Sequence, residues 1–157
     1  MYNKSRVQAL ATMENKFPGQ NFVTYVDAAD LTEETANTAQ TIELADVLAG
    51  EMVTGAAYYL ETPFQDASDA AFNSNQFQFG DGIDPDRFIA NSQLNQNGTE
   101  VPFNTSPGGT SIGRFVYTGA DTLDGVFSSM SGKSLSNLDI GKIWVIFGKT
   151  DVTDIAT

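Results

Sequence analysis

The sequence predicts an all-β fold: an antiparallel β-sandwich or jelly roll with a short N-terminal arm or helix. The 157-residue chain is rich in glycine, with 14, and in phenylalanine, with 11, and this composition favours strands and turns over helices. Seven or eight short apolar or alternating segments are separated by turn-forming residues, which is typical of a two-sheet sandwich. A chain of this length favours one domain that buries roughly 68–70 % of its unfolded surface.

Residues 1–20 are predicted to be an arm that differs in charge from the rest of the chain. They carry three basic residues, Lys4, Arg6 and Lys16, against one acidic residue, whereas the other 137 residues carry 5 basic and 19 acidic ones. The arm therefore has a charge of +2 and the body −14, which suggests that the arm reaches an acidic surface such as a neighbouring copy. The alternative is a short frayed helix, because apolar residues over 7–17 recur at helical spacing.

The body is predicted to span residues 21–149. Its first strand, 21–26, is dense in β-branched and aromatic residues, and the second, 41–45, alternates apolar with polar residues. The third, 51–62, is long, and we expect Pro63 to end it and Gly55 to mark a bulge or bend.

The middle of the body is predicted to hold a strand, a short helix and a long loop. Residues 76–80 alternate strictly, which places two phenylalanines on one face of a strand. Residues 84–90 are expected to form a short helix with Asp84 as its N-cap and Pro85 as its first residue. Residues 91–110 are rich in Asn, Gly, Ser and Thr, which predicts an exposed loop.

Three further strands are expected over residues 112–117, 122–128 and 142–147. The last contains five consecutive apolar residues, which predicts a central strand covered on both faces and a buried Trp144. A polar tail, residues 150–157, follows the sandwich.

Composition excludes several classes of function. The chain has no cysteine and no histidine, which removes disulfides, thiolate nucleophiles, Ser-His-Asp catalysis and the commonest metal ligands. The isoelectric point near 4.1 argues against nucleic acid as a partner, since phosphate binding requires Lys and Arg. No apolar run approaches the 18 residues of a membrane span, and no apolar segment of a signal peptide follows the first residues. We therefore expect a soluble protein made in the cytosol, with no membrane partner.

One group of carboxylates is dense enough to be a candidate calcium site. Asp81, Asp84 and Asp86 lie within a glycine-containing turn, and calcium takes several such oxygen ligands. The spacing is not that of an EF-hand, because Ile83 and Pro85 occupy two of the ligand positions. A turn followed by a helix cap explains the same three residues without a metal. We expect no catalytic residue and no cofactor, since no pair of carboxylates stands out as a glycosidase pair.

Carbohydrate binding is a further alternative, because sugars stack on exposed aromatic rings. Most aromatic residues fall in predicted strands, where we expect core positions. Tyr2, Phe64 and Phe103 are the aromatic residues expected to be exposed, and they are scattered along the chain.

Five segments, in this order, resemble a known class of proteins: residues 45–50 (ADVLAG), 61–66 (ETPFQD), 77–89 (FQFGDGIDPDRFI), 117–122 (YTGADT) and 138–141 (LDIG). The order is similar to that of small structural proteins of tailed-bacteriophage virions, notably capsid decoration (cement) proteins and head-fibre proteins with jelly-roll-like domains. The likeness covers about residues 40–149.

The resemblance implies a non-enzymatic virion structural protein made in the host cytoplasm. It implies a decoration protein on the capsid exterior, a trimer, that binds and stabilises the shell, with the major capsid protein as its partner. On this interpretation Lys4, Arg6 and Lys16 of the arm are capsid-contact candidates. Another virion component, such as a head fibre or tail protein, and a calcium- or carbohydrate-binding β-sandwich module remain alternatives.

Overall fold

The computed structural model describes residues 8–9, 22–72, 74–94 and 114–153. The strands are β1 (Gln8–Ala9), β2 (Phe22–Asp27), β3 (Gln40–Val47), β4 (Glu51–Gln65), β5 (Asn75–Asp81), β6 (Ile89–Gln93), β7 (Phe115–Val116), β8 (Asp121–Ser129) and β9 (Ile140–Asp151). Two short 3₁₀ helices, η2 (Ala28–Asp30) and η3 (Leu135–Asn137), lie in the connections.

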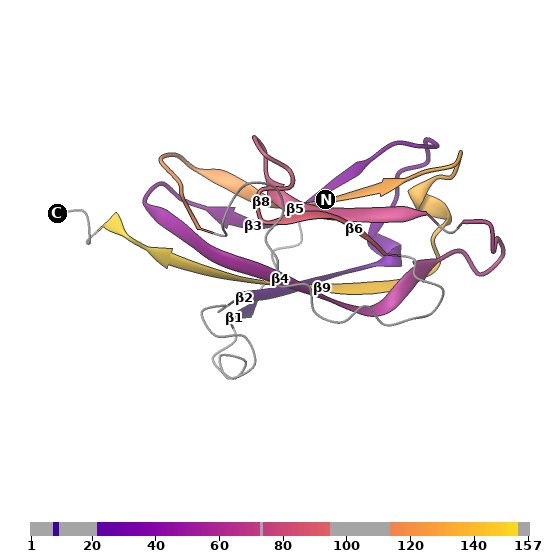
Figure 1. Cartoon of the computed structure of the whole chain (residues 1–157), viewed down its shortest axis with the longest axis horizontal. Helices are drawn as coiled ribbons and strands as arrows, with labels where there is room; N and C mark the ends of the chain where they lie inside the picture. The colour runs from indigo at the N-terminus through magenta and orange to yellow at the C-terminus, as the bar shows by residue number, and fades with distance from the viewer. Residues whose placement is uncertain (1–7, 10–21, 73, 95–113, 154–157) are drawn as a thin grey trace.

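The strands form two stacked antiparallel sheets, which confirms the predicted all-β sandwich (Figure 1). One sheet has the order β1-β2-β9-β4-β7, and the other has the order β3-β8-β5-β6. From β2 to β5 and again from β6 to β9, each strand lies in the opposite sheet from the one before it. This alternation of eight strands between two sheets is the connectivity of a jelly roll.

Phenylalanine rings from both sheets fill the space between them. Phe77 and Phe79 of β5 both point inward and are fully buried, as their alternation predicts. The Phe77 ring centroid lies 5.1 Å from that of Phe127 on β8, and the Phe79 centroid lies 5.9 Å from that of Phe147 on β9. Burying each of these side chains stabilises the fold by about 1.5–3 kcal/mol.

The long strand β4 does not end at Pro63 as predicted but continues to Gln65. Its pairing with β9 shifts register on both sides of Thr62. Proline, which has no N–H, is accepted there because an irregular ladder does not require a bond at every position. The bulge predicted at Gly55 is confirmed, since the register also shifts between Val53 and Gly55.

The helix predicted over 84–90 is wrong. The chain makes a tight turn, in which the Arg87 N–H donates to the Asp84 carbonyl at 3.2 Å, and β6 then begins at Ile89. The Phe88 N–H donates to the Phe79 carbonyl at 3.0 Å, so the segment returns along β5 as an extended chain. On this path Phe88 and Ile89 are both fully buried.

The prediction that Trp144 is buried is also wrong, although β9 is a central strand as expected. Ile143 and Val145 point into the core, so strand alternation places Trp144 on the outer face of the sheet. There it is half-buried, and its ring centroid lies 5.0 Å from that of Tyr25. Ile146, two residues further along on the same face, is 2 % exposed, so the outer face is covered at Ile146 but only partly at Trp144.

Several predictions fall on residues outside the described ranges. They include Lys4, Arg6 and Lys16 of the arm, and most of the loop predicted over 91–110, of which 91–93 belong to β6. The two described arm residues, Gln8 and Ala9, form strand β1, which pairs with the start of β2. At the other end, β9 runs to Asp151, two residues into the predicted tail. Within the described ranges, no helix has the length and apolar character needed to span a bilayer.

Candidate functional site

Three connections meet at one end of the sandwich: the β3–β4 turn (48–50), the β5–β6 turn (82–88) and the β7–β8 turn (117–120). The Gly50 N–H donates to the Tyr117 carbonyl at 2.8 Å, and the Tyr117 N–H donates to the Glu51 carbonyl at 2.9 Å. These bonds join the first turn to the third. We call this part of the molecule the Asp81 end, after the residue that joins the second turn to the third.

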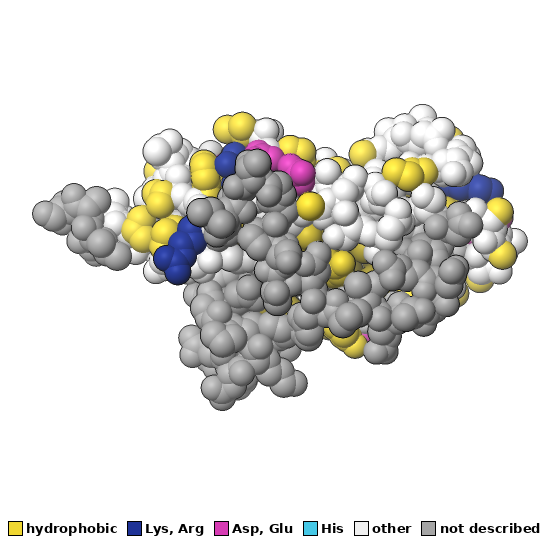
Figure 2. Space-filling model, viewed as in Figure 1, with side chains coloured by type: hydrophobic (Ala, Val, Ile, Leu, Met, Phe, Trp, Pro, Cys, Tyr) yellow, Lys and Arg dark blue, Asp and Glu magenta, His cyan; other side chains and the backbone are white. Residues whose placement is uncertain are grey.

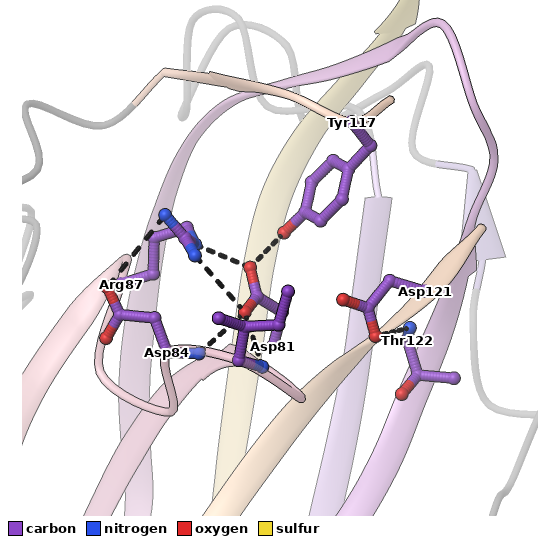
Figure 3. A network of polar contacts seen from close by, with 7 residues as sticks. Asp81, Asp84, Arg87, Tyr117, Asp121 and Thr122 are labelled. Atoms are coloured by element: carbon purple, nitrogen blue, oxygen red, sulfur yellow. Dashed lines mark hydrogen bonds and ion pairs between the residues drawn. The ribbon is translucent and has the colours of Figure 1, made fainter. Parts of the chain in front are cut away.

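Asp81, the last residue of β5, is a buried carboxylate that accepts hydrogen bonds from four residues (Figure 3). Its Oδ2 accepts from Arg87 Nε at 2.5 Å and from the Tyr117 hydroxyl at 2.7 Å. Its Oδ1 accepts from the backbone N–H groups of Ile83 at 3.0 Å and Asp84 at 2.8 Å. One carboxylate therefore closes the β5–β6 turn and ties it to the chain that follows β7.

The pKa shifts in this network keep Asp81 negatively charged at neutral pH. Burial raises the pKa of Asp81, but the hydrogen bonds from Arg87, Tyr117 and the two backbone N–H groups outweigh it and hold the pKa below its usual range. Burial, followed by the hydrogen bond to Asp81, raises the pKa of Tyr117 far above its ordinary value. At neutral pH Asp81 is thus ionised and Tyr117 neutral, and neither has the intermediate pKa that suits general acid–base catalysis.

Arg87 adds a third tie between these segments. Its guanidinium carbon lies 3.9 Å from the centroid of the Phe115 ring, and that ring packs edge-on against Tyr117 at 4.8 Å. A cation over an aromatic face contributes about 0.5–2 kcal/mol. The Asp81 network is therefore a structural fastening built from ion pair, hydrogen bonds and ring packing.

The calcium candidates occupy this same turn. The carboxyl group of Asp86 shares a hydrogen bond with that of Asp84, which raises the pKa of Asp86, and burial and the charge of Asp84 add to the effect. Arg87 forms an ion pair with Asp81, and its Nη1 also lies 3.9 Å from Asp84 Oδ2. In the ranges that the structure describes, no three or more acidic side chains are arranged to hold a metal ion. The turn interpretation accounts for the three residues, although Asp84 caps no helix.

Gly80 allows the β5–β6 turn to fold back over its own strand. A Cβ atom at this position would lie 2.0 Å from the Asp84 carbonyl oxygen and 2.5 Å from the Pro85 carbonyl carbon. The acidic turn is evident in the sequence, but Arg87 and Tyr117 as the partners of Asp81 are not. Tyr117 lies 36 residues away along the chain, and no local pattern reports such a contact.

A second polar and aromatic cluster lies on the outer face of the five-stranded sheet. Tyr25, Trp144 and Tyr59 are paired across three neighbouring strands. The Lys142 ammonium lies 4.8 Å from the Tyr25 ring centroid and 4.6 Å from that of Trp144, and 3.5 Å from Glu61 Oε2. The Trp144 indole N–H donates to the same Glu61 carboxylate. Within this cluster Lys142 is the cation that contacts the aromatic rings, and Glu61 is the hydrogen-bond acceptor of the indole.

The aromatic residues predicted to be exposed do not form a sugar platform among the described residues. Phe64 is fully buried, because the irregular end of β4 turns its ring toward Phe127, with centroids 6.0 Å apart. Tyr2 and Phe103 lie outside the described ranges.

Asp124 is a buried carboxylate of a different kind. It lies on β8 between Glu43 of β3 and Gly80 of β5, and its Oδ1 has no hydrogen-bond partner. Burial raises its pKa, and the nearby charges of Glu43 and Asp121 raise it further. Unlike Asp81, Asp124 is a group whose ionisation costs stability.

Comparison with protein-family models, with curated proteins and with solved structures finds no match for this chain.

Proposed function

We propose that the chain is a non-enzymatic structural protein of a tailed-phage virion, a decoration (cement) protein on the capsid exterior whose partner is the major capsid protein. The observation that carries the proposal is that the Asp81 network holds turns of the chain together. Asp81, the most highly bonded buried carboxylate of the described residues, closes the β5–β6 turn and ties it to Tyr117, and its lowered pKa keeps it ionised at neutral pH. Jelly rolls are common in capsid proteins, and a fastened end provides a stiff surface for binding.

The charge of the chain fits this role. The net charge of −12 keeps unassembled protein soluble and discourages binding to packaged DNA. A shell strained by its contents is stabilised when a protein binds only the expanded form, and many weak contacts sum over many copies. The basic arm, with Lys4, Arg6 and Lys16, supplies part of the contact with the shell, and β1 anchors the arm to the body through β2.

Binding to shells tests the proposal. Expanded, emptied heads of the phage that encodes the chain, lacking this protein, are mixed with purified protein and sedimented. We expect saturable binding to intact heads and weaker binding when residues 1–20 are removed. A Lys4→Ser, Arg6→Ser and Lys16→Ser variant, which keeps the arm but removes its charge, separates the role of charge from that of length. No binding of the wild-type protein contradicts the proposal, and unchanged binding of both variants removes the arm from it.

The proposed trimer is tested by molar mass. Light scattering of the purified protein should give three times the chain mass of 16.9 kDa. A mass of one chain would contradict a trimer in solution. A rise in melting temperature on addition of calcium chloride would instead favour the calcium-binding module.

A further inference from the structure

The exposed large apolar side chains are unevenly placed. Among the described residues they are Ile83, 84 % exposed, Leu48, 58 %, Val116, 46 %, Ile140, 40 %, and Met130, 37 %. Of the three most exposed, Leu48 and Ile83 lie in turns of the Asp81 end, and Val116 is the last residue of β7, directly before the third turn of that end. Met130 and Ile140 lie at the opposite end, in and after the β8–β9 connection. Figure 2 shows hydrophobic side chains beside a basic one at the left of the molecule and others near its top, beside a basic and an acidic side chain, as well as at its right end.

The backbone that carries these three side chains is held in place. The Ile83 N–H donates to Asp81 Oδ1 at 3.0 Å. The Leu48 N–H donates to Glu51 Oε2 at 2.7 Å, and Val116 pairs with Met52 across β7 and β4. A surface that is already ordered loses little conformational entropy when it binds.

The charges around the three side chains indicate the chemistry of a partner. Two basic side chains, Arg87 and Lys149, are engaged with acids, Arg87 with Asp81 at 2.5 Å and Lys149 with Glu51 at 3.1 Å. Several acids of the same end are at least partly exposed: Asp84, Asp86, Asp121 and Asp151. With the exposed Arg114 counted, this end carries three basic side chains, Arg87, Arg114 and Lys149, against six acidic ones, Glu51, Asp81, Asp84, Asp86, Asp121 and Asp151, so acidic side chains predominate around Ile83, Leu48 and Val116.

A partner that fits has apolar depressions bordered by Lys or Arg. A second copy of this chain fits poorly, because two copies meeting through this end would bring the same acids together, and facing like charges disfavour association. We propose that Ile83, Leu48 and Val116 of the Asp81 end form the surface that docks on the shell protein. This inference rests on the proposed function and assigns its binding site.

Variants at the two ends of the sandwich provide the test. Ile83→Asn alone, and together with Leu48→Ser and Val116→Thr, removes apolar area from the Asp81 end without adding charge. Met130→Gln with Ile140→Thr is the matched control at the opposite end. The measurement is the apparent Kd for the emptied, expanded heads, by sedimentation, at two salt concentrations. The melting temperature of each variant shows that the fold is kept, and Ile83→Asn, at the most exposed position, has the smallest effect on it.

We expect Ile83→Asn to weaken binding about 10- to 100-fold, as burial of one isoleucine implies, and the triple variant to weaken it more. The opposite-end variant should bind as the wild type does, and binding should weaken as salt rises. Wild-type binding that the triple variant retains overturns the assigned surface while the proposed function stands. Absence of wild-type binding overturns the proposed function itself. A change of molar mass in the triple variant would assign the surface to contacts between copies and also overturn the inference.

Discussion

Replacing Tyr117 with phenylalanine tests whether the Asp81 network stabilises the fold. The substitution removes one hydroxyl, which donates to Asp81 Oδ2 at 2.7 Å in a buried setting. A hydrogen bond to a charged group contributes about 1.5–3 kcal/mol. Arg87 and the two backbone N–H groups still bind the carboxylate in the variant, so we expect a loss near the middle of that range, about 2 kcal/mol. For a domain of this size this is a fall of about 4–8 °C in melting temperature.

The loss should depend on pH with a definite sign. The pKa of Asp81 is lowered in the folded state, so its stabilisation is present above the unfolded-state pKa, about 3.9, and is lost as the pH falls through the folded-state value. Without the Tyr117 hydroxyl the pKa of Asp81 moves back toward the ordinary value. The gap between wild type and Tyr117→Phe should therefore be widest at neutral pH and should narrow below about pH 4.

Urea unfolding of the wild type and Tyr117→Phe at pH 7 and at pH 3 measures this gap. Tyr58→Phe is the matched control, because Tyr58 is also buried but takes no part in the Asp81 network. Equal unfolding free energies for Tyr117→Phe and wild type at pH 7 would refute the reasoning. A loss of the same size at both pH values would show that the hydroxyl does not act through the ionised carboxylate.

Three other substitutions or measurements probe separate parts of the structure. Gly80→Ala should lower the unfolding free energy by about 3 kcal/mol, because its Cβ meets the Asp84 carbonyl oxygen at 2.0 Å, whereas Gly119→Ala, with open space around it, should change little. Asp124→Asn should raise the unfolding free energy at neutral pH. Because the pKa of Asp124 is raised in the folded state, its carboxyl group stabilises the fold below the unfolded-state pKa, and this stabilisation is lost as the pH rises through the folded-state pKa. Acrylamide should partly quench the fluorescence of Trp144, the single tryptophan, because its ring is half-buried.

Each of these expectations has a contrary result. Equal urea midpoints for Gly80→Ala and Gly119→Ala would contradict the close approach of the β5–β6 turn to β5. A stabilising effect of Asp124→Asn that is as large at pH 3 as at pH 7 would show that charge is not its cause. Quenching of Trp144 only after unfolding would place the indole in the core.

The periodic parts of the fold could be predicted because strand alternation is local. Phe77 and Phe79 are two residues apart, so strand alternation alone predicts that both point to the same face. Gly55 marks a bulge for a similarly local reason, since a residue without a side chain suits an irregular ladder position.

The parts that could not be predicted depend on which of several possible contacts the folded chain makes. Asp84 and Pro85 have the residue types of a helix start, but the Asp84 N–H donates instead to Asp81, and the following chain pairs with β5. Trp144 lies in an apolar run, yet it lies on the outer face of the sheet. There it contacts Tyr25 of β2 and Lys142, two residues earlier on β9. Arg87 and Tyr117 become partners of the Asp81 carboxylate only when the turns meet in the folded protein, so no pattern in the sequence identifies them.

The most direct test of the account is a cryo-electron-microscopy comparison of wild-type heads with heads of a phage that lacks this chain. The account predicts additional density on the outside of wild-type heads that fits the two-sheet sandwich, with the Asp81 end toward the shell. Identical maps from the two kinds of head, with the protein absent from purified virions, would contradict it.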